Sequence, residues 1–265
     1  MDPTLVFDIE SIPDVDGIRR LHDLPASLSD DEVGLWALAQ QRQKNGSEFL
    51  PHYLQRVCAI SCVWREGPEK IAVWSLGETS DDEPTLIQKF FDLIERRTPR
   101  LVSWNGGGFD LPELMQRGLI TGVTASRFLE TGAHDRAFSF DHYLNRYKER
   151  HLDLMDFLAM YQARANAPLD TMAKLCGFPG KLGMDGSQVW PAFQRGEIAT
   201  IRAYCETDAA NTYLLLLRFL AMRGELTHDE YDAELKRLRE KLAATPGEHW
   251  REYLTAWSPP PREEG

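Results

Sequence analysis

Two acidic residues near the start of the chain are spaced so that their side chains can act together. Asp8 and Glu10 lie two residues apart in Leu5–Glu10, an apolar run that predicts a buried strand. Side chains two apart on a strand point to the same face. Two carboxylates this close repel each other, and a divalent cation would relieve the repulsion. The pattern favours a metal site, although a solvated strand end before Pro13 would look the same.

A glycine run in the middle of the chain ends on another acidic residue. Asn105 precedes Gly106–Gly108, and Phe109 and Asp110 follow. Consecutive glycines let the backbone turn sharply and approach a ligand closely. The run is not a phosphate-binding P-loop, because no Lys-Ser or Lys-Thr pair follows it. It is either an ordinary connector between a strand and a helix or a loop that meets a ligand.

A tyrosine and an aspartate lie four residues apart in Ile198–Met222, which is predicted to be a helix. Residues four apart share one helix face. Asp208 can then bind a metal ion while the hydroxyl of Tyr204 orients a water molecule. A phenol is largely protonated at neutral pH, so Tyr204 is expected to position the water and not to remove its proton. A helix with a surface aspartate has the same pattern.

Together, the three segments resemble the DEDD superfamily of 3′–5′ exonucleases, in the subgroup with tyrosine in the third motif. The resemblance is closest to the predicted exonucleases related to the proofreading domain of family B DNA polymerases, and it covers about Leu5 to Leu220. It implies a stand-alone enzyme that uses two Mg²⁺ or Mn²⁺ ions. Its substrate would be single-stranded DNA or frayed DNA 3′ ends, from which it would release nucleoside monophosphates.

The same resemblance implies a role for each residue of the catalytic set. Asp8 would bridge the two ions, Glu10 would hold one of them, and Asp110 would bind the second partly through water. Asp208 would complete the metal ligands, and Tyr204 would orient the attacking water. The ions would lower the pKa of that water and stabilise the attacking and leaving oxygens.

Three further residues are candidates for substrate contacts. The resemblance implies that Asn105 touches the terminal nucleotide and that Phe109 stacks on a base, unless Phe109 simply packs in the core. Lys181 lies in the glycine-rich segment Gly180–Gly186 and is a candidate phosphate contact, unless the segment is a plain connector. Asp153 is expected either to support the metal ligands indirectly or to be a solvated carboxylate.

The composition fits an enzyme that holds a strand end better than a protein that coats long duplexes. The 265 residues include 41 Asp and Glu against 30 Lys and Arg, a formal net charge of −11. Binding along a duplex uses many basic side chains. The first residues lack the pattern of a signal peptide, and the Leu214–Leu217 run is too short to span a bilayer. We therefore expect a cytoplasmic protein with reduced cysteines and no membrane contact.

The order of the predicted elements is that of an α/β protein. The predicted strands are Leu5–Glu10, a hairpin of Val57–Trp64 and Lys70–Leu76, Leu101–Trp104, and a strand or strand-to-helix junction at Leu152–Leu158. Helices are predicted after Ser29, from Pro84, after the glycine run, and at Leu169–Leu175, Ile198–Met222 and Thr227–Leu242. The resemblance implies a more specific fold: a ribonuclease-H-like mixed five-stranded sheet flanked by helices.

The chain is expected to contain one catalytic domain and a short extension. Residues 1–225 would form the exonuclease domain, with a helical insertion at about residues 15–50. Residues 226–265 would form a helical extension, followed by a proline-rich, charged tail from Trp257 to Gly265 that is predicted to be disordered.

Two alternatives to a DNA exonuclease remain open at this stage. The chain could be a 3′–5′ exoribonuclease, because contacts to the 2′-hydroxyl group distinguish RNA from DNA and no pattern in the sequence reveals them. It could also be a catalytically inactive nucleic-acid-binding module. The intact acidic set argues against that reading, because clustered carboxylates repel each other without a cation. The sequence does not indicate any protein partner.

Overall fold

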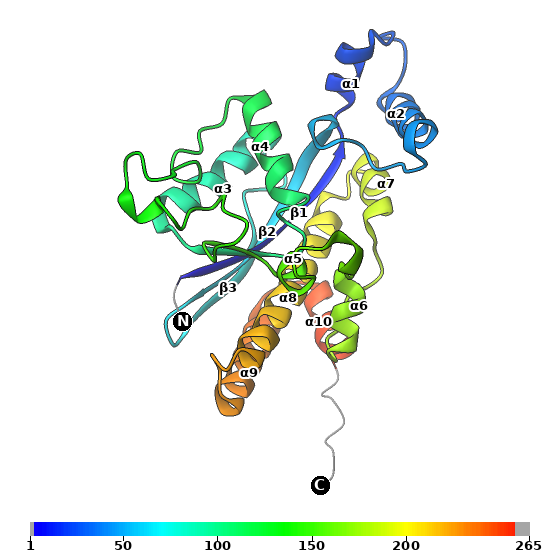
Figure 1. The fold of residues 1–265 in the computed structure, drawn as a ribbon. Coiled ribbons are helices and arrows are strands. Elements are labelled where there is room, and N and C mark those ends of the chain that lie inside the picture. Colours follow the sequence, from blue (N-terminus) through cyan, green and yellow to red (C-terminus); the bar gives the residue numbers. More distant parts are fainter. Residues whose placement is uncertain (1–2, 258–265) are drawn as a thin grey trace.

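A five-stranded mixed sheet runs through the centre of the computed structural model, which describes residues 3–257 (Figure 1). Its strands are β1 (Thr4–Pro13), β2 (Gln55–Glu66), β3 (Lys70–Ser75), β4 (Arg100–Ser103) and β5 (His151–Asp153), in the spatial order β3-β2-β1-β4-β5. The β1–β2 and β2–β3 pairs are antiparallel, whereas β4 is parallel to both β1 and β5. This is the ribonuclease-H-like topology, so the expected fold is confirmed.

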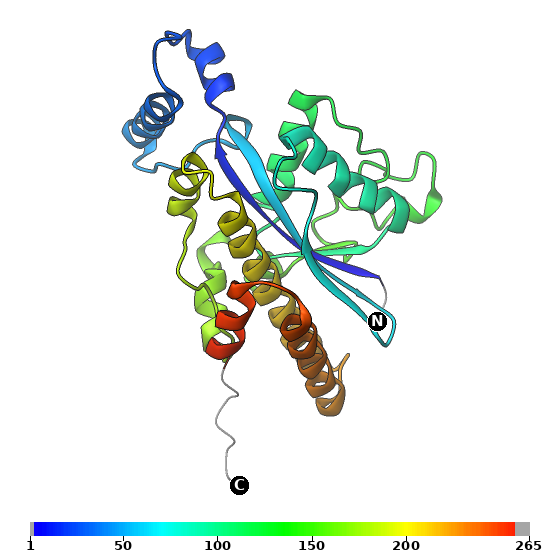
Figure 2. The same ribbon diagram turned by 180° about the vertical axis from the view of Figure 1, so that it is seen from behind.

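Helices cover both faces of the sheet (Figures 1 and 2). They are α1 (Val15–His22), α2 (Asp30–Asn45), α3 (Glu83–Arg97), α4 (Asp110–Thr121), α5 (Leu154–Leu158), α6 (Leu169–Leu175), α7 (Val189–Gln194), α8 (Ile198–Met222), α9 (His228–Ala244) and α10 (Glu248–Ala256). One apolar core joins the sheet to α3 and α4, and another joins it to α6, α8, α9 and α10. No helix among the described residues has the length and apolar character needed to cross a membrane.

The first strand is buried on both faces, which explains its nearly continuous apolar sequence. Phe7 and Ile9 pack in the core under α3 and α4, whereas Val6 packs in the core under α8. Because side chains alternate along a strand, Asp8 and Glu10 project to the same side as Val6. The strand therefore directs both carboxylates toward α8.

The segment between β1 and β2 contains two helices, at the end of the sheet that is close to α7 (Figure 1). A capping box begins α2: the side chains of Ser29 and Glu32 each accept a hydrogen bond from the other residue's backbone N–H group. Gly46 ends the helix in the left-handed conformation, with a φ of 78°. The helix predicted after Ser29 is therefore confirmed, whereas α1 was not predicted.

The C-terminal helices are anchored to the sheet by a buried ion pair. The Arg65 Nε on β2 donates to the Glu234 carboxylate on α9 at 2.8 Å, and the Tyr213 hydroxyl on α8 donates to the same group at 3.0 Å. The predicted helix from Thr227 corresponds to α9, and α10 follows it as a second, unpredicted helix. Most of the tail that was expected to be disordered, from residue 258 onward, lies outside the described residues.

Candidate active site

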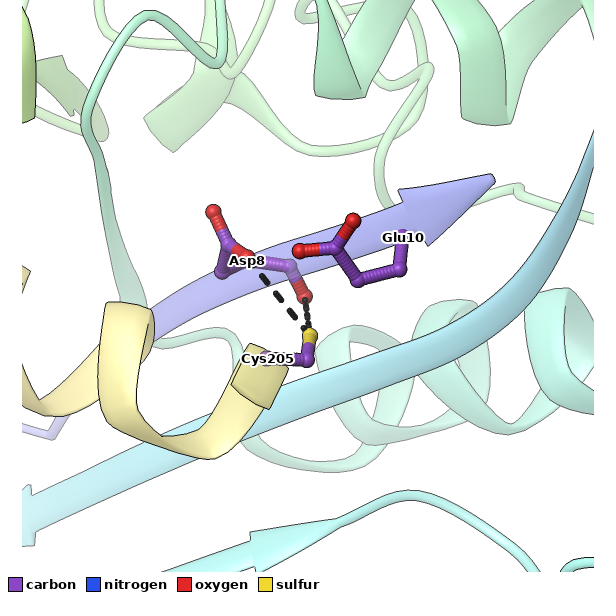
Figure 3. Close-up of side chains that lie close together, drawn as sticks. All are labelled: Asp8, Glu10 and Cys205. Atoms are coloured by element: carbon purple, nitrogen blue, oxygen red, sulfur yellow. Dashed lines mark hydrogen bonds between the residues drawn. The ribbon is translucent and has the colours of Figure 1, made fainter. Parts of the chain in front are cut away.

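The first two acidic residues lie side by side on β1, facing α8 (Figure 3). One ligand atom from each of Asp8, Glu10 and Cys205 lies within 4.8 Å of the others. The Cys205 thiol on α8 donates to the Asp8 carbonyl oxygen at 3.3 Å and lies 3.6 Å from its carboxylate. A break in the β1–β2 register follows Glu10, and such bulges commonly redirect side chains next to active sites.

The third acidic residue reaches the same place from the start of α4. The backbone N–H of Ile9 donates to Asp110 Oδ1 at 3.2 Å, so the first residue of α4 is joined directly to the strand that carries Asp8 and Glu10. The Asp110 side chain is buried. A carboxylate at this position also interacts favourably with the positive end of the helix dipole.

The glycine run before Asp110 is held by a carboxylate from β5. Asp153 accepts hydrogen bonds from the backbone N–H groups of Asn105, at 3.0 Å, and Gly107, at 2.9 Å. Asn105 has a left-handed φ of 67°, and a Cβ atom at Gly106 would collide with the Ser103 side chain. Asp153 therefore supports the loop before Asp110 by accepting hydrogen bonds from the backbone of that loop.

The fourth acidic residue lies on α8, one turn after the tyrosine. Lys181 donates to the Tyr204 hydroxyl, and its Nζ lies 3.2 Å from Asp208 Oδ2. Tyr204 and Asp208 are both buried. The other oxygen of Asp208, Oδ1, is buried without a hydrogen-bond partner among the described residues. An unpartnered buried carboxylate oxygen is costly, so this atom is suited to bind a ligand.

All eight predicted site residues line one pocket of about 760 Å³. They are Asp8, Glu10, Asn105, Phe109, Asp110, Lys181, Tyr204 and Asp208. Among the described residues around this pocket, six are acidic and Lys181 is the single basic one. The structure thus brings residues that are 200 positions apart in the chain into one strongly acidic cavity.

The pocket strongly favours the protonated form of its carboxyl groups. Burial, reinforced by the carboxylates of Asp110 and Asp208, raises the pKa of Asp8 well above its usual value. Burial also raises the pKa of Glu10, with a further contribution from Asp208. The pKa of Asp110 rises to about 8, again chiefly through burial. Burial raises the pKa of Asp208 as well, although the nearby ammonium group of Lys181 opposes the rise.

The donor set fits hard divalent cations. Four carboxylates from β1, α4 and α8 supply oxygen atoms, which Mg²⁺ and Mn²⁺ prefer, and Asp208 Oδ1 has no other partner among the described residues. Metal ions would also neutralise the repulsion between carboxylates that adds to the effect of burial on the pKa values of Asp8 and Glu10. Tyr204 is different, because burial followed by the charge of Asp208 raises its pKa and keeps its hydroxyl protonated.

One pocket residue that the sequence analysis missed is an aromatic side chain from the insertion. Phe49 lines the pocket, and its ring centroid lies 5.4 Å from that of Phe109. Trp190 of α7 lines the pocket as well. No local sequence pattern marks either residue, because both positions depend on how α2 packs against α7. Cys205 was missed as a neighbour of Asp8, although it is not among the described residues that line the pocket, since a cysteine within a helix is usually a core residue.

A comparison of the sequence with known protein families finds one match. Residues 47–257 match a family described as predicted 3′–5′ exonucleases related to the exonuclease domain of PolB. The match begins after β1, so Asp8 and Glu10 lie outside it. No curated protein sequence matches the chain.

Among solved structures, the chain is similar to a family B DNA polymerase from the hyperthermophilic archaeon Pyrobaculum calidifontis, with 18% sequence identity and a TM-score of 0.48. The similar region covers 83% of this chain and 25% of the polymerase chain. The chain therefore spans about a quarter of that polymerase's length.

Proposed function

The chain belongs to the family of predicted 3′–5′ exonucleases related to the exonuclease domain of PolB, and from this premise we propose that it is a metal-dependent exonuclease acting on single-stranded or frayed DNA 3′ ends. The observation that carries the proposal is the acidic pocket. Four carboxylates from three separate elements converge there with one lysine. When ionised, these carboxylates repel phosphate unless cations are bound among them.

The four carboxylates are proposed as the metal ligands. Asp8 and Glu10 approach from β1, Asp110 from the start of α4, and Asp208 from α8. We assign two ions, Mg²⁺ or Mn²⁺, to this set. When bound, such ions activate water and neutralise the charge that develops on the phosphate group during hydrolysis. The hydrogen bond from the backbone N–H of Ile9 on β1 to the side chain of Asp110 on α4 holds these two elements together at the site.

Tyr204 and Lys181 are proposed to orient the reacting groups. The Tyr204 hydroxyl remains protonated in the buried pocket, so it can hold a water molecule in position by hydrogen bonding. Lys181 bonds to that hydroxyl and to Asp208. Its ammonium group can contact a substrate phosphate in the same pocket. Asn105 and Phe109, on the loop held by Asp153, are proposed to contact the terminal nucleotide.

The proposed domain division follows the site. Residues 1–225 would form the exonuclease domain, with the helical insertion at about 15–50, and residues from 226 onward would form an extension. Among the described residues, those that line the pocket all precede residue 225. Helices α9 and α10 are therefore assigned a supporting role beneath β3 and α8.

The proposal is tested by degradation of 5′-labelled single-stranded DNA and RNA oligonucleotides with Mg²⁺, Mn²⁺ or EDTA. We expect a ladder that shortens from the 3′ end of DNA with either metal and disappears with EDTA. Asp208→Asn should reduce the rate at least ~100-fold, because it removes a charge that stabilises the transition state through the metal. Asp229→Asn, at an exposed position on α9, serves as the control.

Each alternative has its own outcome in the same assay. Preferred degradation of RNA would replace the DNA assignment with an exoribonuclease. Binding without cleavage by folded protein, under every metal condition, would contradict the enzyme and favour an inactive nucleic-acid-binding module.

A further inference from the structure

We propose that Phe49, carried by the segment between α2 and β2, stacks on the base of the 3′-terminal nucleotide beside Phe109. This inference rests on the proposed function and specifies how the same pocket recognises its substrate. The group recognised is the flat face of an unpaired base, without regard to its identity. The insertion would thereby contribute directly to substrate selection.

The Phe49 ring lies where it can meet a ligand in the pocket. Phe49 is 54% exposed although its ring is large and apolar, and it lines the same pocket as the four carboxylates. Its ring meets Phe109 edge to face, at 5.4 Å between centroids, and the His52 ring lies 5.4 Å from Phe109 and 6.2 Å from Phe49. An edge-to-face contact covers only part of each ring. The remaining exposed surface of Phe49 is therefore open to a planar ligand in the pocket.

The backbone around Phe49 is held in place by hydrogen bonds on both sides. The backbone N–H of Phe49 donates to Ser47 Oγ at 3.0 Å, and the N–H of Ser47 donates to Asn45 Oδ1 at 3.0 Å. On the other side, Gln55 Nε2 donates to the carbonyl oxygen of Leu50 at 2.9 Å, and Leu50 is only 4% exposed. A segment whose backbone is already fixed loses little conformational entropy when its side chain binds a ligand.

The insertion packs against α7 beside the pocket. Helix α2 approaches α7 closely at Gly34, where a Cβ atom would lie 2.9 Å from Trp190 Nε1. Gln194 on α7 donates to Asp31 on α2 at 2.8 Å. Leu38 of α2 and Trp190 both line the pocket. The insertion thus forms one wall of the cavity, and Phe49 belongs to that wall.

The charge of the pocket lining favours a contact with a base over contacts between basic side chains and phosphate. Among the described residues that line the pocket, Lys181 is the single basic side chain against six acidic ones. Apart from bound cations, Lys181 is therefore the one basic group of the described pocket lining that can contact the phosphate backbone. Stacking on aromatic side chains is independent of charge and tolerates every base. A base stacked between its neighbours in a duplex cannot present its face to Phe49, whereas an unstacked base at a frayed or single-stranded end can, so the contact favours such ends.

The experiment measures binding instead of cleavage. Fluorescence anisotropy of a 5′-labelled single-stranded DNA oligonucleotide is recorded with the full chain in Ca²⁺, and a gel verifies that the DNA stays intact. Phe49→Ala is compared with Tyr53→Ala, since Tyr53 is an aromatic residue 49% exposed on the same connection but not among the described residues lining the pocket. A second oligonucleotide has an abasic 3′-terminal nucleotide.

We expect Phe49→Ala to weaken binding of the normal oligonucleotide roughly 5- to 150-fold, the range that removal of one stacking contact produces. Binding of the abasic oligonucleotide should be nearly the same for wild type and Phe49→Ala. Tyr53→Ala should bind both oligonucleotides as the wild type does. Phe49→Trp should retain the affinity that Phe49→Ala loses, because it keeps an aromatic face.

Unchanged binding of the normal oligonucleotide by Phe49→Ala would overturn this inference and leave the exonuclease proposal standing. Equal weakening for both oligonucleotides would also overturn it, because the base would then not be the group that Phe49 contacts. Failure of the wild type to bind any oligonucleotide would contradict the proposed function as well. Circular dichroism melting of each variant establishes that it is folded.

Discussion

Two groups of buried acidic side chains in this protein differ in whether the chain supplies their counter-charge. Around Arg117 on α4, the guanidinium group bonds to Asp14 at 2.7 Å and to Glu83 at 2.7 Å, and its Nε donates to Glu83 at 2.8 Å. The three side chains are at most 11% exposed. In this group, a basic residue of the chain itself balances the buried acids.

The pocket acids have no comparable partner. Asp8, Glu10, Asp110 and Asp208 share Lys181, whose ammonium group contacts Asp208 and whose side chain is 31% exposed. Asp208 Oδ1 has no partner among the described residues. The comparison teaches that buried acids with a structural role are paired within the fold, whereas a surplus of buried acids is a capacity for binding external cations.

The largest expected effect comes from breaking the paired group. Arg117→Met should lower the free energy of unfolding by about 3–5 kcal/mol, because it leaves two buried carboxylates without a counter-charge. Lys181→Met should lower the free energy of unfolding by less than this in the same buffer, since the pocket carboxyl groups with raised pKa values can retain protons. Urea unfolding in EDTA measures both.

The control for this prediction is Arg97→Met, which removes a surface ion pair with Glu66 in which both side chains are partly exposed. That change should cost less than about 1 kcal/mol. Equal losses for Arg117→Met and Lys181→Met would remove the distinction between the two groups.

For each pH unit, a smaller effect is expected in the pH dependence of the unpaired group. The pKa of Asp110 is about 8 in the folded protein and about 3.9 in an unfolded chain. Between these values the folded state retains a proton that the unfolded state releases, so metal-free stability should fall as pH rises. The contribution of Asp110 is up to about 1.4 kcal/mol for each pH unit.

Asp110→Asn isolates this contribution, because asparagine does not titrate and can still accept the hydrogen bond from Ile9. The stability of the variant relative to wild type should increase from about pH 4 to about pH 8. Burial lowers the pKa of His151 to about 4, which acts in the opposite direction, but it is common to both proteins and cancels in the difference. A pH-independent difference would show that Asp110 is ionised in the metal-free protein.

The sequence revealed those parts of the fold and candidate site that depend on local periodicity. The two-residue spacing of Asp8 and Glu10 and the four-residue spacing of Tyr204 and Asp208 place each pair on one face of its element. The positions of most strands along the chain and the start of a helix after Ser29 were predictable from local patterns too, whereas the five-stranded fold was implied by the family resemblance. At β5, three residues pair with β4 before α5 begins, so the sequence could only suggest a strand or a junction.

Features that depend on long-range packing were not predictable. The position of Lys181 against Tyr204 and Asp208 depends on the path of a loop, and no periodicity describes that path. Phe49 reaches the pocket because α2 docks on Trp190, which requires the missing side chain at Gly34. The role of Asp153 depends on a contact with the backbone of a loop 46–48 residues earlier.

The most direct test of the central claim, that the surplus of pocket acids binds divalent cations, is isothermal titration of Mn²⁺ into metal-free protein, in two buffers of different ionisation enthalpy. We predict saturable binding of two ions per chain with release of protons, because carboxyl groups with raised pKa values must ionise to bind metal. Asp208→Asn should weaken or abolish the binding, whereas Asp229→Asn should not. Absence of saturable binding by wild type, or identical binding by Asp208→Asn, would contradict the account.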